Sequence, residues 1–361
     1  MDIQDYLLEK EKRVERSTQR FRDLRVFDFN YIPERPLMRD EMKPIIDALV
    51  RYDKTRIANH LLIIGSRGCG KTLSVRYLEH LFRSRGLTVL YCNCRTHNTS
   101  YKMLASLLEV RARSVSFDEL AKRFKDRWPD KTVIILDEVD LISDKDKNKD
   151  ILYFLSRSEG NYMTILLSNS PKWVNVLDES IQSTLQPQQI HFRSYNASEL
   201  GQILQDRARS GIVRVPAKVI REIAALTAKY TNSEVRVAIK TLYYWATKPG
   251  VSLEENFQKA RRDIVVDVIN NLNDRNLLIL RAATLARDRP VKEVYETYRR
   301  LSLEHKEEPF SYVYYYSSLS YLQSLGLILL ISTKVGRTYT NVIQLTFSSE
   351  VLDAVWRWRF V

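Results

Sequence analysis

The chain has 361 residues, 44% of them apolar and 28% charged, with a formal net charge of +13 and three cysteines. This length predicts two or three domains, each large enough to bury a core. The cysteines are too few for a disulfide framework, no apolar run approaches the roughly 20 residues that cross a bilayer, and the charged N-terminus is unlike a signal peptide. We therefore expect a protein of the cytoplasm, nucleoid-associated (nuclear in a eukaryote), without a membrane partner. The positive charge favours an anionic partner such as nucleic acid.

Strands and helices alternate over the first half of the chain. Short apolar strands are predicted at 60–65, 88–94, 132–140, 162–170 and 189–195, with helices between them. This order predicts an α/β fold in which helices cover both faces of a parallel sheet. Cys92 and Cys94 lack a second pair of candidate ligands, so they are interpreted as ordinary strand residues.

From Asn196 the strands stop and helices follow one another. Asn196 with Glu199 forms a capping-box pattern at the first of them. Further helices are predicted at 216–230, 232–248 and 261–273. The last part of the chain predicts three helices and then two strands around a polar turn, which is the pattern of a winged helix-turn-helix. The predicted domains are residues 1–195, 196–273 and 274–361.

The segment "GSRGCGKT", residues 65–72, fits the pattern G-x-x-x-x-G-K-[ST] between a predicted strand and a predicted helix. Glycines let backbone N–H groups approach phosphate oxygens, and the helix N-terminus adds its positive dipole end. Lys71 is expected to reach the β- and γ-phosphates, and Thr72 to ligate Mg²⁺. The candidate nucleotide-binding residues of this loop are Gly65, Ser66, Arg67, Gly68, Cys69, Gly70, Lys71, Thr72 and Leu73.

Two further predicted strands end in polar side chains. Asp137, at the end of "VIILDEVD", is expected to hold Mg²⁺ together with Thr72, and Glu138 to polarise an attacking water. Asn169, at the end of "TILLSNS", is a candidate for orienting that water against the γ-phosphate. With Lys71, these are the candidate catalytic residues.

Together these segments resemble the AAA+ initiators of the archaeal and eukaryotic origin-recognition and cell-division-cycle type, and the archaeal members in particular. The resemblance covers nearly the whole chain and includes "YIPERPLMRDEM" (31–42), "LDEVDLI", "LSNS" and the "R-x-A-I" helix. It implies a parallel AAA+ P-loop sheet, a helical lid domain and a C-terminal winged-helix domain. It also implies that Tyr31 and Arg39 lie beside the nucleotide base, and that Asn169 and Arg236 are the first and second sensors of the γ-phosphate.

The resemblance implies an ATP-dependent initiator of DNA replication. Such a protein binds origin duplex DNA through its winged helix and AAA+ domain, uses ATP/ADP and Mg²⁺, and has other initiator paralogues and the replicative helicase as partners. This chain departs from the family at two places. Ser180 replaces an arginine that reaches a neighbouring nucleotide, and Ser233-Glu234 replaces Gly-Asp before the second sensor. Slow hydrolysis, with ATP acting mainly as a switch, is therefore expected.

The resemblance also suggests where DNA is bound. The predicted recognition helix, 311–323, offers hydroxyl groups but no Arg or Lys, which is weak for a reader of the major groove. For each tyrosine the alternative is packing in the domain core. The turn between the last two strands carries basic residues, as does the segment 95–110, which occupies the place of the family's initiator-specific insertion. The candidate DNA contacts are Tyr312, Tyr314, Tyr315, Ser317, Ser318, Lys334, Arg337, Arg95 and Lys102.

Two alternatives stay open. One is a clamp-loader or helicase-loader type of AAA+ ATPase, against which the predicted C-terminal hairpin argues. The other is a DNA-binding transcription regulator that senses nucleotide without needing hydrolysis, which Ser180 keeps open.

Overall fold

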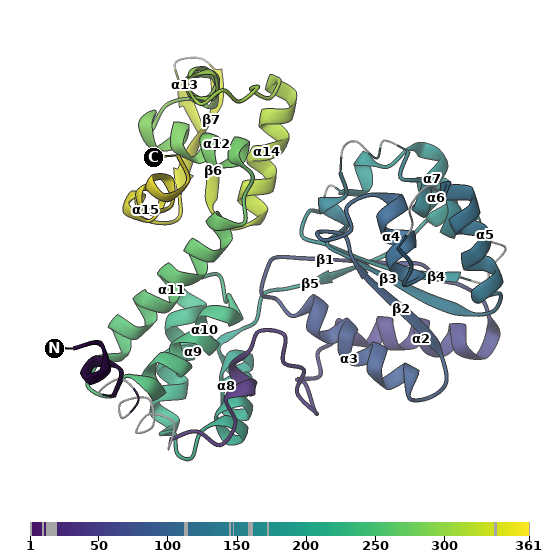
Figure 1. The fold of residues 1–361 in the computed structure, drawn as a ribbon, viewed down its shortest axis with the longest axis horizontal. Coiled ribbons are helices and arrows are strands. Elements are labelled where there is room, and N and C mark those ends of the chain that lie inside the picture. The colour runs from purple at the N-terminus through teal and green to yellow at the C-terminus, as the bar shows by residue number, and fades with distance from the viewer. Residues whose placement is uncertain are drawn as a thin grey trace. The chain divides into compact units, whose positions relative to one another are not determined.

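The computed structural model describes residues 2–8, 11, 20–111, 115–143, 146, 148–157, 162–171, 173–335 and 338–360 (Figure 1). The chain divides into two units, one formed by Asn30–Ser194 and the other by Met1–Phe29 with Tyr195–Val361. In the part of the chain so described, no helix is both long and apolar enough to cross a membrane.

A five-stranded parallel sheet forms the centre of the Asn30–Ser194 unit, as the alternating pattern predicted. The strand order is β2-β3-β4-β1-β5. The strands are β1 (Leu61–Gly65), β2 (Thr88–Asn93), β3 (Thr132–Asp137), β4 (Tyr162–Ser168) and β5 (Gln188–Phe192). After β1 the chain crosses to β2 at the far edge, so β1 lies between β4 and β5 and the strand order reverses beside it. In parallel sheets the crevice at such a reversal, outside the carboxyl ends of the strands, is where ligands bind.

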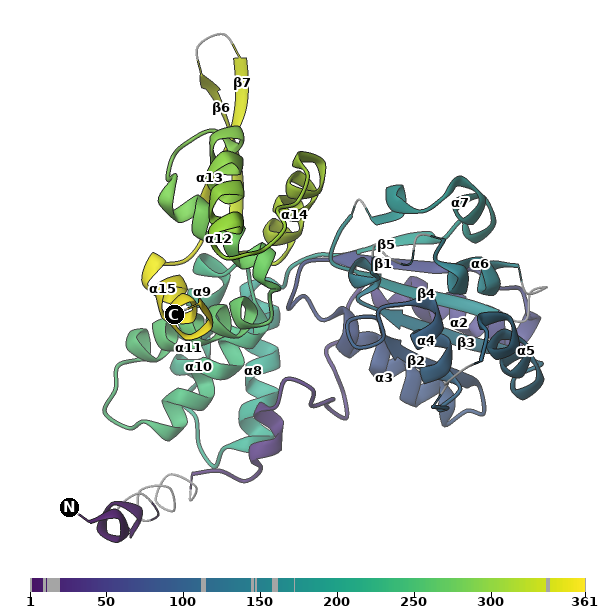
Figure 2. The same ribbon diagram turned by 45° about the horizontal axis from the view of Figure 1, so that its top comes forward.

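Helices cover both faces of this sheet, which explains why its strands read as continuous apolar runs. Alternate strand residues such as Leu61 and Ile63 pack against α2 (Met42–Thr55) and α3 (Lys71–Arg83). Their neighbours, such as Leu62 and Ile64, pack on the opposite face (Figures 1 and 2). The helices of that second face are α4 (Ser100–Leu107), α5 (Phe117–Arg127), α6 (Asp150–Ser156) and α7 (Glu179–Leu185). Two short 3₁₀ helices, Val139–Leu141 and Trp173–Val176, follow β3 and β4.

Four helices follow the sheet, as predicted: α8 (Ala197–Gly211), α9 (Ala217–Tyr230), α10 (Val235–Thr247) and α11 (Leu253–Asn270). The predicted capping box of Asn196 and Glu199 is present at the start of α8. The prediction for α11 was wrong at its start, because the helix begins at Leu253 rather than at Arg261. A second capping box, Ser252 with Glu255, stabilises that earlier start.

The segment from Phe21 to Phe29 is grouped with these helices rather than with the sheet, and the predicted domain bounds stay a prediction. Phe21 forms an antiparallel bridge with Ile212, and the Arg22 N–H donates to the Gly211 carbonyl at 2.9 Å. The buried Arg207 of α8 donates to the Val26 carbonyl in the 3₁₀ helix Leu24–Phe27. A buried guanidinium needs such acceptors, so these bonds fasten the segment to α8.

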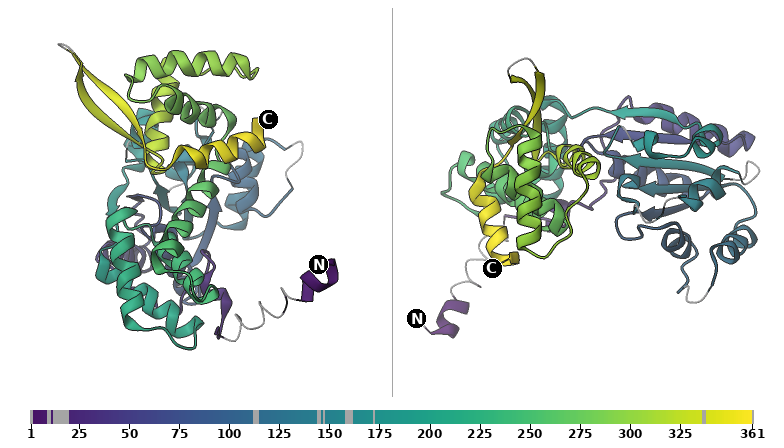
Figure 3. Two further views of the ribbon diagram at one scale, coloured as in Figure 1. Left: turned by 90° about the vertical axis from the view of Figure 1, so that its left-hand side faces the viewer. Right: turned by 90° about the horizontal axis from the view of Figure 1, so that it is seen from above.

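The last part of the chain has the predicted winged-helix arrangement. The elements α12 (Asp274–Leu285), α13 (Val291–Glu304) and α14 (Tyr312–Ser324) precede an antiparallel hairpin of β6 (Ile328–Val335) and β7 (Thr338–Leu345). This hairpin projects from the helices (Figures 2 and 3). A last helix that was not predicted, α15 (Ser349–Phe360), closes the core. Val268 and Ile269 at the end of α11 belong to the same core, so α11 joins the two helical parts without a linker.

His60, just before β1, gives the sheet a pH-dependent stability. Its Nδ1 lies 3.1 Å from the Thr164 N–H and 2.8 Å from the Thr164 hydroxyl, and burial lowers the pKa of His60 to about 4. The unfolded chain, with its ordinary imidazole pKa, therefore binds more protons between pH 6.5 and 4, and stability falls as the pH drops through that window.

We expect His60→Asn, whose amide oxygen can accept the same bonds, to remove this part of the pH dependence. Between pH 7 and pH 5 the wild-type chain should lose up to about 2 kcal/mol more than the variant. Urea unfolding at both pH values measures the difference. Parallel pH profiles for the two proteins would contradict the assignment.

Candidate functional site

The loop from Gly65 to Gly70 joins β1 to the N-terminus of α3, and two of its glycines are required by the geometry. A Cβ on Gly65 would lie 2.6 Å from the Phe192 carbonyl oxygen of the neighbouring β5. Gly70 has a φ of 91°, which side chains other than glycine rarely adopt. The loop can therefore turn tightly beneath the helix end, with its N–H groups directed to an anion.

Lys71 is buried and its ammonium is directed at the loop itself. Its Nζ donates to the carbonyl oxygens of Gly65 at 2.7 Å and Ser66 at 3.0 Å. It also donates to Oδ1 of Asn169 at 3.0 Å. The structure thus brings together Lys71 and Asn169, which lie 98 residues apart in the sequence.

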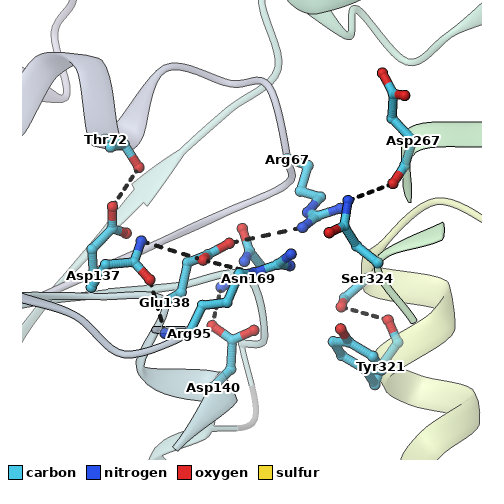
Figure 4. A network of polar contacts seen from close by, with 12 residues as sticks. Arg67, Thr72, Arg95, Asp137, Glu138, Asp140, Asn169, Asp267, Tyr321 and Ser324 are labelled. Carbon is cyan, nitrogen blue, oxygen red and sulfur yellow. Dashed lines mark hydrogen bonds and ion pairs between the residues drawn. The ribbon is translucent and has the colours of Figure 1, made fainter. Parts of the chain in front are cut away.

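Asp137 lies at the end of β3 and is almost fully buried. Its Oδ2 accepts a hydrogen bond from the Thr72 hydroxyl at 2.9 Å (Figure 4). It also accepts one from the Tyr91 hydroxyl at 2.8 Å. Burial raises the pKa of Asp137, while these two bonds lower it. A buried carboxylate with this environment favours a positive charge as its neighbour.

Glu138 follows directly, with a left-handed backbone conformation (φ 57°) that turns its side chain out of the strand. Its carboxylate lies 3.2 Å from Nε of Arg95 and 3.8 Å from Nη2 of Arg67. Nδ2 of Asn93 donates to it at 3.4 Å. Figure 4 shows both arginines beside this carboxylate. Arg95 was expected to contact DNA. In the structure it pairs with the candidate water-activating residue, and its DNA contact stays a prediction.

Asp140 positions Asn169. Its Oδ1 accepts from the Asn169 N–H at 2.9 Å and from the Ser168 hydroxyl at 3.2 Å. The site also contains Asp140, Tyr91 and Asn93, which were not predicted. Asp140 could have been predicted from the sequence, because it is the third acidic residue of "DEVD". The two β2 residues could not, since only the sheet register places Asn93 opposite Asp137.

Arg39 was predicted to lie beside a nucleotide base, and the structure gives its guanidinium a different set of partners. The side chain is buried and donates to the carbonyl oxygens of Cys69 at 2.7 Å and Arg193 at 2.8 Å. It also pairs with Glu41 at 2.7 Å. It therefore braces the glycine-rich loop against β5. Tyr31 is partly buried in the irregular segment before α2, and its predicted contact stays a prediction.

Arg236 belongs to the other unit, near the start of α10, where its guanidinium pairs with Glu234 at 2.7 and 2.9 Å. Its predicted approach to the γ-phosphate stays a prediction. Ser180 is exposed on α7.

The winged-helix part was expected to contact DNA, and its candidate residues differ in how exposed they are. Tyr312, Tyr314 and Ser317 of α14 are exposed, as is Lys334 of β6, whereas Ser318 is partly buried. Tyr315 is fully buried and its hydroxyl donates to the Val291 carbonyl, so the prediction that it contacts DNA is wrong. Arg337 lies outside the described residues.

Tyr339 was not predicted, because nothing in the sequence separates it from the buried tyrosines nearby. It faces Lys334 across the hairpin and is 77% exposed. In the sheet unit, Lys102 of α4 is also exposed.

The side-chain oxygen atoms of Thr72 and Asp137 are suitable ligands for a hard cation that is bound together with a nucleotide. Mg²⁺ prefers oxygen ligands. It is usually held by one or two protein ligands together with phosphates and water. Among the residues that the structure describes, no three His, Cys, Asp or Glu side chains form a metal cluster, and Cys92 and Cys94 are buried and free.

Known proteins share this architecture. A family model described as an AAA domain matches residues 55–177. The chain is 31% identical over 336 residues to the ORC1-type DNA replication protein 1 of Sulfolobus acidocaldarius, covering 83% of this chain and 82% of that protein.

Two solved structures match over 94% of this chain, each at 24% identity. The Aeropyrum pernix Orc1 protein in complex with DNA has a TM-score of 0.70 and is covered over 97% of its length. The Aeropyrum pernix ORC2 protein in ADPNP–ADP complexes has a TM-score of 0.58 and is covered over 99%.

The bonds of Arg39 predict a large stabilising contribution. Arg39→Met keeps most of the volume but removes the donors to Cys69, Arg193 and Glu41. We expect a loss of about 2–4 kcal/mol in the free energy of unfolding, measured by urea titration. Arg123→Met is the matched control, because Arg123 pairs with Glu119 on the surface and should cost less than about 0.5 kcal/mol. Equal losses in the two variants would contradict the bracing role.

Proposed function

The chain belongs to the family of ORC1-type DNA replication proteins, and from this premise we propose that it is an initiator of DNA replication that binds origin duplex DNA and is switched by ATP. The observation that carries the proposal is the meeting of three distant segments in one place. Thr72 bonds to Asp137, and Lys71 bonds to Asn169, at the carboxyl ends of β1, β3 and β4. The Aeropyrum ORC2 structure, named as ADPNP–ADP complexes, supports nucleotide as the ligand.

In this proposal the chain's own groups bind and orient the triphosphate. The loop N–H groups and Lys71 hold the β- and γ-phosphates, and Asn169, fixed by Asp140, orients water beside them. Thr72 and Asp137 would hold Mg²⁺, which would supply positive charge to the phosphates. Arg236, on a helix of the second unit, is the candidate for sensing the γ-phosphate.

Hydrolysis is proposed to be slow for two reasons. Glu138 is paired with Arg95 and Arg67, so its carboxylate must leave these partners before it can accept a proton from water. Ser180, at the place where the family has a finger arginine, cannot supply charge to a neighbour's transition state. ATP binding, rather than turnover, would then set the state of the protein.

DNA binding is proposed for the exposed wing, supported by Lys334 and Tyr339 and by the hydroxyls of Tyr312 and Ser317 on α14. The related Aeropyrum Orc1 protein is described in complex with DNA. Because α14 carries no charged residue, its contacts add little to the salt-dependent part of the affinity. Lys102 is the candidate for a second contact from the sheet unit. Initiator paralogues and the replicative helicase are the proposed protein partners.

The nucleotide site is tested by two variants that separate binding from turnover. We expect Lys71→Ala to weaken ATP binding at least about tenfold, because it removes the cation that faces the phosphates. Glu138→Gln should bind ATP as the wild type does while single-turnover hydrolysis falls about 100-fold. Calorimetry measures the first and quenched-flow kinetics the second. Unchanged affinity in Lys71→Ala would contradict the proposed site.

The wing is tested through its salt dependence. Lys334→Ala should make the slope of log K against log salt less steep by about 1, and to the same extent for different duplex sequences. Fluorescence anisotropy with a labelled duplex measures the slope. Lys218→Ala, an exposed lysine of α9, is the control and should leave the slope unchanged. Identical slopes for Lys334→Ala and wild type would rule out the phosphate contact.

A further inference from the structure

We propose that Tyr91 is a positioning residue for Mg²⁺ binding: its hydroxyl holds the Asp137 carboxylate, and Arg76 and Glu79 of α3 hold its ring. This inference rests on the proposed nucleotide function and adds residues to that site. Tyr91 lies on β2, in a strand that contributes none of the motifs by which the site was found.

The hydroxyl of Tyr91 and that of Thr72 donate to the same oxygen, Oδ2 of Asp137, at 2.8 and 2.9 Å. The two donors differ in what they do once a metal is present. Thr72 is itself a candidate Mg²⁺ ligand, so its hydroxyl oxygen would be used by the metal. Tyr91 would then be the donor that fixes the rotamer of Asp137, in the way that outer partners orient metal-binding carboxylates.

Tyr91 is suited to remain a donor. Its phenolic O–H donates to the Asp137 carboxylate at 2.8 Å, and a carboxylate can only accept.

The ring of Tyr91 is in turn held from α3. The Arg76 guanidinium lies over it, 4.2 Å from the ring centroid. Glu79 pairs with Arg76 at 2.6 Å and with Arg83 at 3.0 Å, and the Glu79 side chain is 1% exposed. Arg83 also donates to the Val89 carbonyl of β2 at 2.7 Å. The buried carboxylate therefore organises two arginines along β2, and one of them fixes Tyr91.

A purely structural role for these residues would fasten α3 to β2 and nothing more. The two roles differ in one measurable quantity, the coupling between Mg²⁺ and nucleotide. A structural role changes stability alone. A positioning role weakens the affinity of Mg²⁺ for the nucleotide complex and leaves metal-free nucleotide binding unchanged, because the phosphates are held by the loop and Lys71.

The test uses the full-length chain and the non-hydrolysable analogue ADPNP. Its dissociation constant is measured in excess EDTA and then across a Mg²⁺ titration, for wild type and for Tyr91→Phe, which keeps the ring under Arg76. We expect the Mg²⁺ midpoint of the variant to rise about tenfold, while its affinity in EDTA stays within about twofold of wild type. Equal Mg²⁺ midpoints would overturn the inference.

Tyr52→Phe is the matched control. Tyr52 is a fully buried tyrosine whose hydroxyl bonds to the backbone of Thr132, at the opposite end of β3 from Asp137. It should lose stability with no change in the Mg²⁺ midpoint, and an equal shift in this control would also overturn the inference.

Arg76→Met decides the question if Tyr91→Phe does not fold. Arg76 is partly exposed, and its replacement loosens the ring without touching Asp137. The Mg²⁺ midpoint should rise about threefold, in line with the strength of a cation–π contact. Binding of ADPNP to the wild type distinguishes failure of the proposed nucleotide function from failure of the proposed role of Tyr91. If wild type does not bind ADPNP, the proposed function fails, whereas normal binding with an unshifted midpoint in the variants sinks only the role of Tyr91.

Discussion

The hydrogen bonds onto one buried oxygen, Oδ2 of Asp137, are the interaction on which the site depends. They join the end of β3 to the first turn of α3 through Thr72 and to β2 through Tyr91. A buried carboxylate without such donors is costly, so the three segments are stable only together. The strand order makes the meeting possible, because it brings segments that lie far apart along the chain to the same edge of the sheet.

The charged side chains of the site bond to other groups of the protein. Lys71 bonds to carbonyl oxygens of its own loop, and Glu138 pairs with Arg95 and Arg67. A triphosphate must therefore replace existing bonds of Lys71, so the gain on binding is a difference between two sets of hydrogen bonds. In the proposed hydrolysis, Glu138 would likewise act on water only after its arginines release it. Both candidate catalytic groups are thus bonded to other groups of the protein in this structure.

Patterns with a fixed local geometry predicted most of this structure. The glycine-rich loop, the strand-end acids and the alternation of strands and helices each express a local physical rule, and each is found where expected. The features that were not predicted come from tertiary contacts. The burial of Tyr315 depends on neighbours distant in sequence. So do the attachment of the N-terminal segment to α8 and the ion pair of Arg95 with Glu138. Tyrosines in "YVYYY" look alike in the sequence, and packing alone makes one of them core and leaves others exposed.

The bonds of Arg39 also concern the path of the chain between its two units. Since the segment from Phe21 to Phe29 packs with the helical unit, the chain connects the two units twice, after Phe29 and again between Ser194 and Tyr195. Arg39 follows the first connection closely, and it bonds to the Arg193 carbonyl just before the second. Arg39 also donates to the Cys69 carbonyl of the glycine-rich loop. A single buried side chain therefore links the glycine-rich loop to the residue that follows β5, just before the second connection.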